Sequence, residues 1–136
     1  MSIKKGKIFL MALFLFSITS QAYSFDICEE GRKGLTDTNA VYTEYFNSHI
    51  RGNNAAGYAK VRDIYPTDRS DHYLIKLDCG NDVILLATSD SAFLKDIKVR
   101  QEVSYSCQVK SWQKLFYRDS DKYYIQITLG DCSIRY

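Results

Sequence analysis

The chain has 136 residues, and its 18 Lys and Arg against 16 Asp and Glu give a formal net charge of +2. This length fits one domain and excludes an assembly of several large ones. The near balance of charge gives no support for a strongly basic, nucleic-acid-binding protein.

The N-terminus, residues 1–24, has the features of a secretory signal peptide. Three lysines within the first seven residues precede an apolar segment, 8–18, that is too short to span a bilayer. Small residues then flank a cleavage site at 22–24, with a second candidate at 20–22. We therefore expect removal of residues 1–24 and a periplasmic or secreted mature domain at 25–136.

Removal of this leader changes the charge of the protein. The leader holds three lysines and no acid, so the mature chain has 15 bases against 16 acids and a formal charge of −1. Nucleic acid is therefore disfavoured as a partner. Four scattered bases could cluster, although a solvated face is the favoured interpretation; they are Lys60, Arg62, Arg69 and Lys76. No transmembrane segment is expected after the leader.

An N-terminal helix is predicted at about 38–51, where apolar residues recur every three or four positions. Residues 36–38 can cap its start and Gly52 can end it. The side chains on its apolar face are Val41, Tyr42, Tyr45, Phe46, His49 and Ile50.

Beyond a short linker at 53–57, the apolar pattern changes to the alternation that is typical of strands. We predict strands at 58–65, 72–79 and 83–88, with a polar turn at 66–71 between the first two. A short helix that carries Phe93, Leu94 and Ile97 is then predicted, with a cap at 89–91.

Two long strands are predicted at 102–113 and 123–129, and the polar segment 118–121 forms the turn of their hairpin. A hairpin centred near residue 119 places Val109 opposite Leu129. This register would place Cys107 one residue away from Cys132, and a bulge at Gly130 would bring the two cysteines together.

The exported part contains four cysteines, which predicts two disulfides in an oxidising compartment. Their spacing lacks the close pairs of a zinc site or a thioredoxin-like redox site. Three connectivities are possible, and the hairpin register favours Cys107–Cys132, which leaves Cys28–Cys79. Loop entropy suggests about 3–4 kcal/mol of stabilisation for each bridge.

The predicted fold is mainly β with an N-terminal helix: a five-stranded, OB-fold-like Greek-key barrel with a short helix between strands 3 and 4. The chain resembles exported bacterial OB-fold proteins of the tRNA_anti-like type. The resemblance covers about residues 40–135 and involves Tyr45 with Asn47, the strand Gly57–Ile64, and Cys132-Ser133-Ile134. It implies a fold and a binding habit rather than an activity.

No catalytic motif, cofactor site or metal site is expected. The two histidines, His49 and His72, are in no pattern that indicates a triad. A small hydrolase would need a cleft that joins His72 to Asp68 or Asp71, and this is the least favoured hypothesis. We therefore expect a protein that is not an enzyme.

Aromatic residues near the last hairpin form the candidate binding site, because strand alternation exposes some of them beside basic residues. The candidates are Trp112, Phe116, Tyr117 and Arg118. The alternative is that these rings cover the barrel end and pack on the N-terminal helix. OB-folds commonly bind ligands at the loops that correspond here to 66–71 and 117–121.

These features favour a small, disulfide-bonded, exported module that binds a protein partner in the cell envelope. The partner would make it an inhibitor, an immunity protein or an accessory component. The alternative is an OB-fold module that binds an oligosaccharide or single-stranded nucleic acid.

Overall fold

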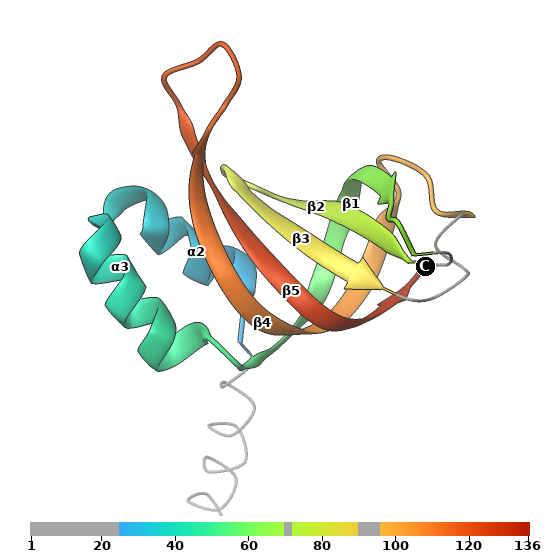
Figure 1. The fold of residues 1–136 in the computed structure, drawn as a ribbon, viewed down its shortest axis with the longest axis horizontal. Coiled ribbons are helices and arrows are strands. Elements are labelled where there is room, and N and C mark those ends of the chain that lie inside the picture. The colour runs from blue at the N-terminus through green and yellow to red at the C-terminus, as the bar shows by residue number, and fades with distance from the viewer. Residues whose placement is uncertain (1–24, 70–71, 90–95) are drawn as a thin grey trace, which may run out of the picture.

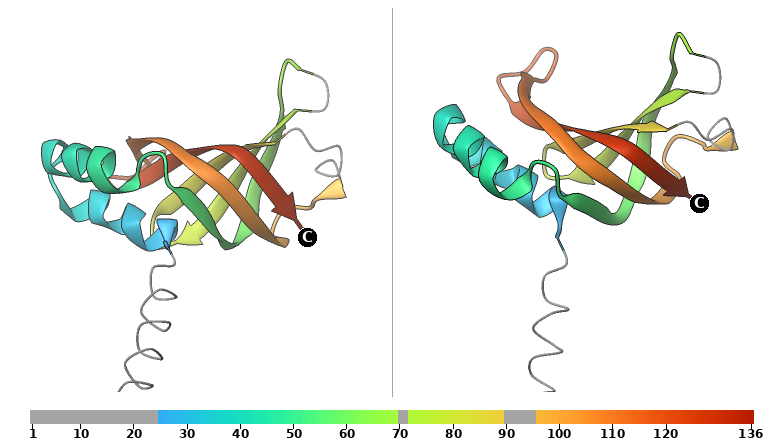
Figure 2. Two further views of the ribbon diagram at one scale, coloured as in Figure 1. Left: turned by 90° about the horizontal axis from the view of Figure 1, so that it is seen from below. Right: turned by 60° about the horizontal axis from the view of Figure 1, so that its bottom comes forward.

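The computed structural model describes residues 25–69, 72–89 and 96–136, which form a closed five-stranded barrel with helices at one end (Figures 1 and 2). The helical elements are α2 (Ile27–Thr36), α3 (Asn39–Tyr45) and the π-helical turn η1 (Phe46–Ile50). The strands are β1 (Asn54–Pro66), β2 (Tyr73–Gly80), β3 (Val83–Ser89), β4 (Glu102–Phe116) and β5 (Tyr123–Arg135).

The strands follow the order β1-β2-β3-β5-β4 around the barrel. Neighbours are antiparallel except for β3 and β5, which run parallel. This is the strand arrangement of the OB-fold, and it confirms the predicted five-stranded barrel. Alternate side chains point into the barrel and are buried, as on β4, where they are Val103, Tyr105, Cys107 and Val109.

Val109 lies opposite Leu129, as the hairpin pattern predicts, but the pairs nearer the turn are offset by one residue because the pairing shifts between Val109 and Ser111. The pairing shifts between Ser106 and Gln108, so that Asp131 and Cys132 both lie opposite Cys107. The bulge therefore begins one residue after Gly130, and Asp131 takes a positive φ of 52°. It brings the Cα atoms of Cys107 and Cys132 to 4.2 Å, where a disulfide joins them.

The helix predicted at about 38–51 is present as α3 followed by η1. The Thr38 side chain caps its start by accepting a hydrogen bond from the Val41 amide at 3.3 Å. Gly52, with a φ of 83°, follows its end, as expected. The buried side of this segment consists of Tyr42, Phe46 and Ile50.

Helix α2 was not predicted, and it covers the end of the barrel beside α3 (Figure 2). Its buried residues are Ile27 and two glycines, Gly31 and Gly34. A Cβ on Gly31 would lie 2.7 Å from Cγ1 of Val83, and one on Gly34 would lie 2.9 Å from Cδ1 of Ile125. Because glycine has no side chain, the helix backbone can lie directly against the barrel.

Two further links hold α2 in place. A disulfide joins Cys28 in its first turn to Cys79 at the end of β2, so both disulfides are the pairs that the sequence favoured. The Tyr42 hydroxyl donates a hydrogen bond to the Glu30 carbonyl oxygen at 3.0 Å and connects α3 to α2.

The structure corrects two other predictions. The expected linker 53–57 is mostly strand, since β1 starts at Asn54 and pairs with β4 from its first residue; its small residues show no alternation. The short helix expected after β3 falls mainly on residues 90–95, outside the described residues. Ile97 is buried, but the described segment 96–101 is not α-helical and turns at Val99–Arg100. The helices with described bounds, α2, α3 and η1, precede β1, and α2 covers the barrel end.

In the part of the chain that the structure describes, no helix is both long enough and apolar enough to cross a membrane.

Candidate functional site

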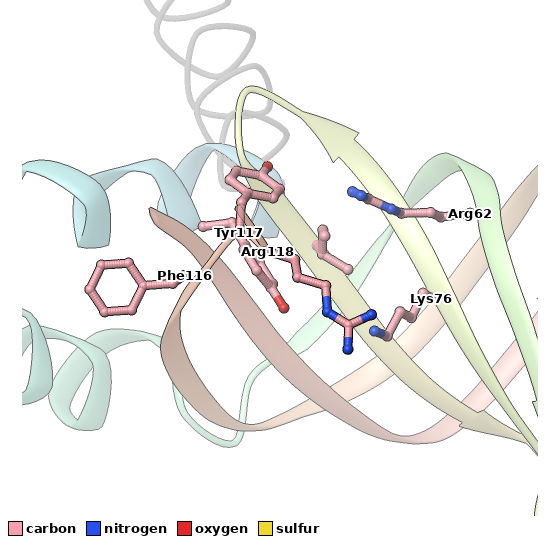
Figure 3. A pocket seen from close by; sticks show the side chains of 7 residues that line it. Arg62, Lys76, Phe116, Tyr117 and Arg118 are labelled. Carbon is pink, nitrogen blue, oxygen red and sulfur yellow. The ribbon is translucent and has the colours of Figure 1, made fainter. Parts of the chain in front are cut away.

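A surface groove of about 460 Å³ lies on the outside of the barrel, beside the base of the β4–β5 hairpin (Figure 3). Seven residues line it. They are Arg62 from β1, Lys76 from β2, Ile84 from β3, Tyr124 from β5, and Phe116, Tyr117 and Arg118 from the β4–β5 hairpin. Residues from all five strands or their connections therefore meet at one place.

Three of these residues are cations, and backbone geometry brings them together. The β1–β2 pairing shifts between Val61 and Asp63, which leaves Arg62 as the extra residue of a bulge. Bulges redirect a side chain relative to the regular alternation. Lys76, on β2, lies opposite Asp63 of β1. Arg118 follows the end of β4 in the hairpin turn. The three positive charges thus come from three separate parts of the chain.

No carboxylate of the described residues forms an ion pair with these three cations. The ion pairs recorded in the described ranges are Lys33–Glu30 at 3.1 Å and Lys110–Asp131 at 3.6 Å, and both lie outside the groove. The Lys76 ammonium lies 5.6 Å from the centre of the Tyr65 ring. The groove therefore presents positive charge that favours an anionic ligand.

The aromatic residues of the groove are packed in pairs. The Tyr117 and Tyr124 ring centres are 4.8 Å apart, and those of Phe116 and Tyr123 are 4.1 Å apart. Ile84 beside them is only 3% exposed, whereas Phe116 is 62% exposed. The Phe116 ring points away from Arg62 and Lys76, so it forms the edge of the groove (Figure 3).

A hydrogen bond fixes the hairpin over the barrel. The Tyr117 hydroxyl donates to Oδ1 of Asp82, in the β2–β3 turn, at 2.7 Å. Burial, and then this hydrogen bond, raise the pKa of Tyr117 to about 12, although the nearby Arg62 opposes the rise. The hydroxyl therefore keeps its proton at physiological pH, and the contact holds one wall of the groove in position.

Three of the four binding residues predicted from the sequence, Phe116, Tyr117 and Arg118, line this groove. Trp112 lies elsewhere. Its ring packs edge-on against Tyr42 of α3 at 4.7 Å and lies 6.4 Å from Phe46. For Trp112, the alternative that the aromatics pack on the N-terminal helix is therefore correct.

The sequence prediction did not assign Arg62, Lys76, Ile84 or Tyr124 to the site. The sequence identifies Arg62 and Lys76 as bases that could cluster but favours a solvated face for them. The pairing of β1 with β2 would have placed them on neighbouring strands, while the bulge at Arg62 has no clear mark in the sequence.

Neither His49 nor His72 lines the groove. His49 is exposed and its ring stacks on that of Tyr45 at 4.8 Å. His72 precedes β2, and Asp71, one of its two hypothetical partners, lies outside the described residues. Among the residues that the structure describes, no group of three or more His, Cys, Asp or Glu could hold a metal ion.

Comparisons with known proteins give little further information. No family model and no curated protein matches the chain. Among solved structures, the chain is similar to an aspartyl tRNA synthetase from Entamoeba histolytica, with 14% identity and a TM-score of 0.44. The match covers 74% of this chain and 21% of that one, so it spans about a fifth of the synthetase. A likeness at this level carries no conclusion about function.

Proposed function

We propose that this protein is an exported binding module that engages a protein partner in the cell envelope through the groove. The observation that carries the proposal is that Arg62, Lys76 and Arg118, which form no ion pair with a described carboxylate, lie beside the paired rings of Tyr117 and Tyr124. Arginine and tyrosine are among the residues that contribute most to protein interfaces.

The rigidity of the scaffold supports this function. Two disulfides, Cys28–Cys79 and Cys107–Cys132, tie α2 to the barrel and β4 to β5. Disulfides of this kind suggest an oxidising, extracytoplasmic environment, which agrees with the leader expected at residues 1–24. A preformed groove loses little conformational entropy on binding, which favours affinity.

Single-stranded nucleic acid is the second candidate, because arginine beside tyrosine also suits bases and phosphates. The expected mature charge of −1 argues against it, since nucleic-acid affinity depends mainly on neutralised phosphates. No specific feature of the groove favours an oligosaccharide.

The test is affinity capture from an envelope extract with three forms of the protein: the unaltered chain, Arg62→Ala/Arg118→Ala, and the matched control Arg32→Ala/Lys60→Ala. Both double variants remove two exposed cations, but Arg32 and Lys60 do not line the groove. We expect one stoichiometric protein that the unaltered chain and the control retain and the groove variant loses.

Equal capture by both double variants would show that the groove is not the binding site. A captured species that nuclease treatment removes would instead favour the nucleic-acid function.

A further inference from the structure

We propose that the groove recognises an acidic peptide segment, in which Asp or Glu side chains of the partner bind Arg62, Lys76 and Arg118. This inference rests on the proposed function and specifies the chemistry of its ligand. An apolar side chain of the same segment would pack against Tyr117 and Tyr124, next to the cations.

The cations suit carboxylates in number and kind. Two of the three are arginines, whose planar guanidinium groups form paired hydrogen bonds with a carboxylate. No described carboxylate forms an ion pair with any of the three cations, and the neighbouring Asp63 accepts a hydrogen bond from the Tyr65 hydroxyl at 2.7 Å instead.

A carboxylate already lies next to one residue of the groove, Tyr117. Asp82 accepts a hydrogen bond from the Tyr117 hydroxyl, and Arg62 lies close enough to Tyr117 to affect the pKa of that hydroxyl. A carboxylate is therefore accommodated beside the aromatic wall without an ion pair of its own. A partner carboxylate would occupy the region between Arg62, Lys76 and Arg118, with which no described carboxylate forms an ion pair.

The small number of cations makes a short peptide a better ligand than a single-stranded nucleic acid, because three positive side chains line the groove. A long polyanion would have to extend past three cations onto a domain with an expected net charge of −1, whereas a short acidic segment would not.

The test measures binding of three fluorescent probes by anisotropy at low salt. The first is an eight-residue peptide of alternating glutamate and tyrosine, and the second replaces every glutamate with glutamine. The third is an oligothymidylate with the same net charge as the first peptide. We expect the glutamate peptide to bind at least about tenfold more tightly than either of the others.

Variants locate the binding. Arg118→Ala and Lys76→Ala should each weaken binding of the glutamate peptide by about fivefold or more, while Arg32→Ala should leave it within about twofold. Arg118 is exposed in a turn, so its loss should not affect folding. Equal binding of the two peptides, tighter binding of the oligothymidylate, or equal effects of Arg118→Ala and Arg32→Ala would each overturn the inference.

Failure here differs from failure of the proposed function. If the groove variant loses a captured protein partner but the glutamate peptide does not bind, the acidic-peptide inference is wrong and the protein-binding function stands. If capture does not depend on the groove at all, the proposed function itself is wrong.

Discussion

Trp112 and Tyr117 are five residues apart in one hairpin, yet they belong to two different regions of the molecule. Trp112 is paired with the buried Ile127 and packs against α3, where it joins the barrel to the helices. Tyr117 leans to the other side, packs against Tyr124 and bonds to the β2–β3 turn. One region holds the fold together, and the other forms the groove.

The difference shows why a cluster of aromatics in a sequence need not be a cluster in space. Successive strand residues point to opposite faces, so a hairpin supplies two surfaces from one segment. Substitutions on the helix side should therefore lower stability, whereas substitutions on the groove side should lower binding.

The largest expected effect comes from Trp112→Ala. Loss of the contacts with Tyr42 and Phe46 should lower the free energy of unfolding by about 3 kcal/mol, at the lower end for a large aromatic because Trp112 is half-buried. The matched variant Phe116→Ala, at an exposed position, should lower it by less than about 1 kcal/mol. Thermal denaturation measures both, and equal effects would contradict the division of the hairpin into two regions.

Alkaline pH should destabilise the barrel through Tyr105. Burial raises the pKa of this hydroxyl from 10.0 to about 12, so the folded protein keeps a proton that the unfolded chain loses between these pH values. The stabilisation is complete below pH 10 and is lost as the pH rises toward 12. The loss is on the order of 2 kcal/mol.

Urea denaturation at pH 8, 10 and 11.5 tests this expectation. Tyr105→Phe should flatten the pH dependence of the free energy of unfolding. At pH 8 it should cost little, because the partner of this hydroxyl among the described residues is the sulfur of Cys28, at 3.8 Å. Tyr117→Phe should flatten it less, since Tyr117 is more exposed. An unchanged slope in Tyr105→Phe would remove Tyr105 as the cause.

Gly34→Ala tests the close contact of α2 with the barrel end. The added Cβ would lie 2.9 Å from both Ile125 and Tyr42, which should cost about 1–3 kcal/mol by overpacking. Alanine favours helix by about 1 kcal/mol over glycine, so a net loss of stability would show that packing dominates. Arg32→Ala, at an exposed position of the same helix, is the control and should change stability by less than about 0.5 kcal/mol.

The strands could be predicted because their pattern is local, and the register of the last hairpin even favoured the Cys107–Cys132 pair. Helix α2 could not, because hydrophobic periodicity identifies a helix by its apolar stripe. In α2 the buried face includes Gly31 and Gly34, which are poor helix formers and more often indicate turns. The barrel, rather than the helix sequence, determines this packing.

The candidate site also has one part that local sequence predicts and another that it does not. Phe116, Tyr117 and Arg118 are neighbours at a predicted turn, so local sequence was enough to select them. Arg62 and Lys76 reach the groove through strand pairing and a bulge, which are properties of the assembled barrel. Sequence reasoning therefore found the part of the groove that one segment supplies and missed the part that requires the fold.

The smallest expected change in stability should give the most information about the groove. Tyr117→Phe removes the hydroxyl that bonds to Asp82 and keeps the ring that packs against Tyr124. One partly exposed hydrogen bond should contribute about 0.5–1 kcal/mol. Its loss should release the hairpin turn, so amide hydrogen exchange should accelerate across residues 117–122 while β4 beside Trp112 stays protected.

Asp82→Asn is the matched control for this substitution. The asparagine side-chain oxygen can still accept a hydrogen bond from the Tyr117 hydroxyl, and asparagine tolerates the positive φ of 64° at this position. Exchange in the turn should therefore stay near that of the unaltered protein, although the charge has gone. Equal acceleration in both variants would assign the effect to the carboxylate charge. No acceleration in Tyr117→Phe would mean that ring packing alone holds the groove wall, and the division of the hairpin would then depend on side-chain faces rather than on this hydrogen bond.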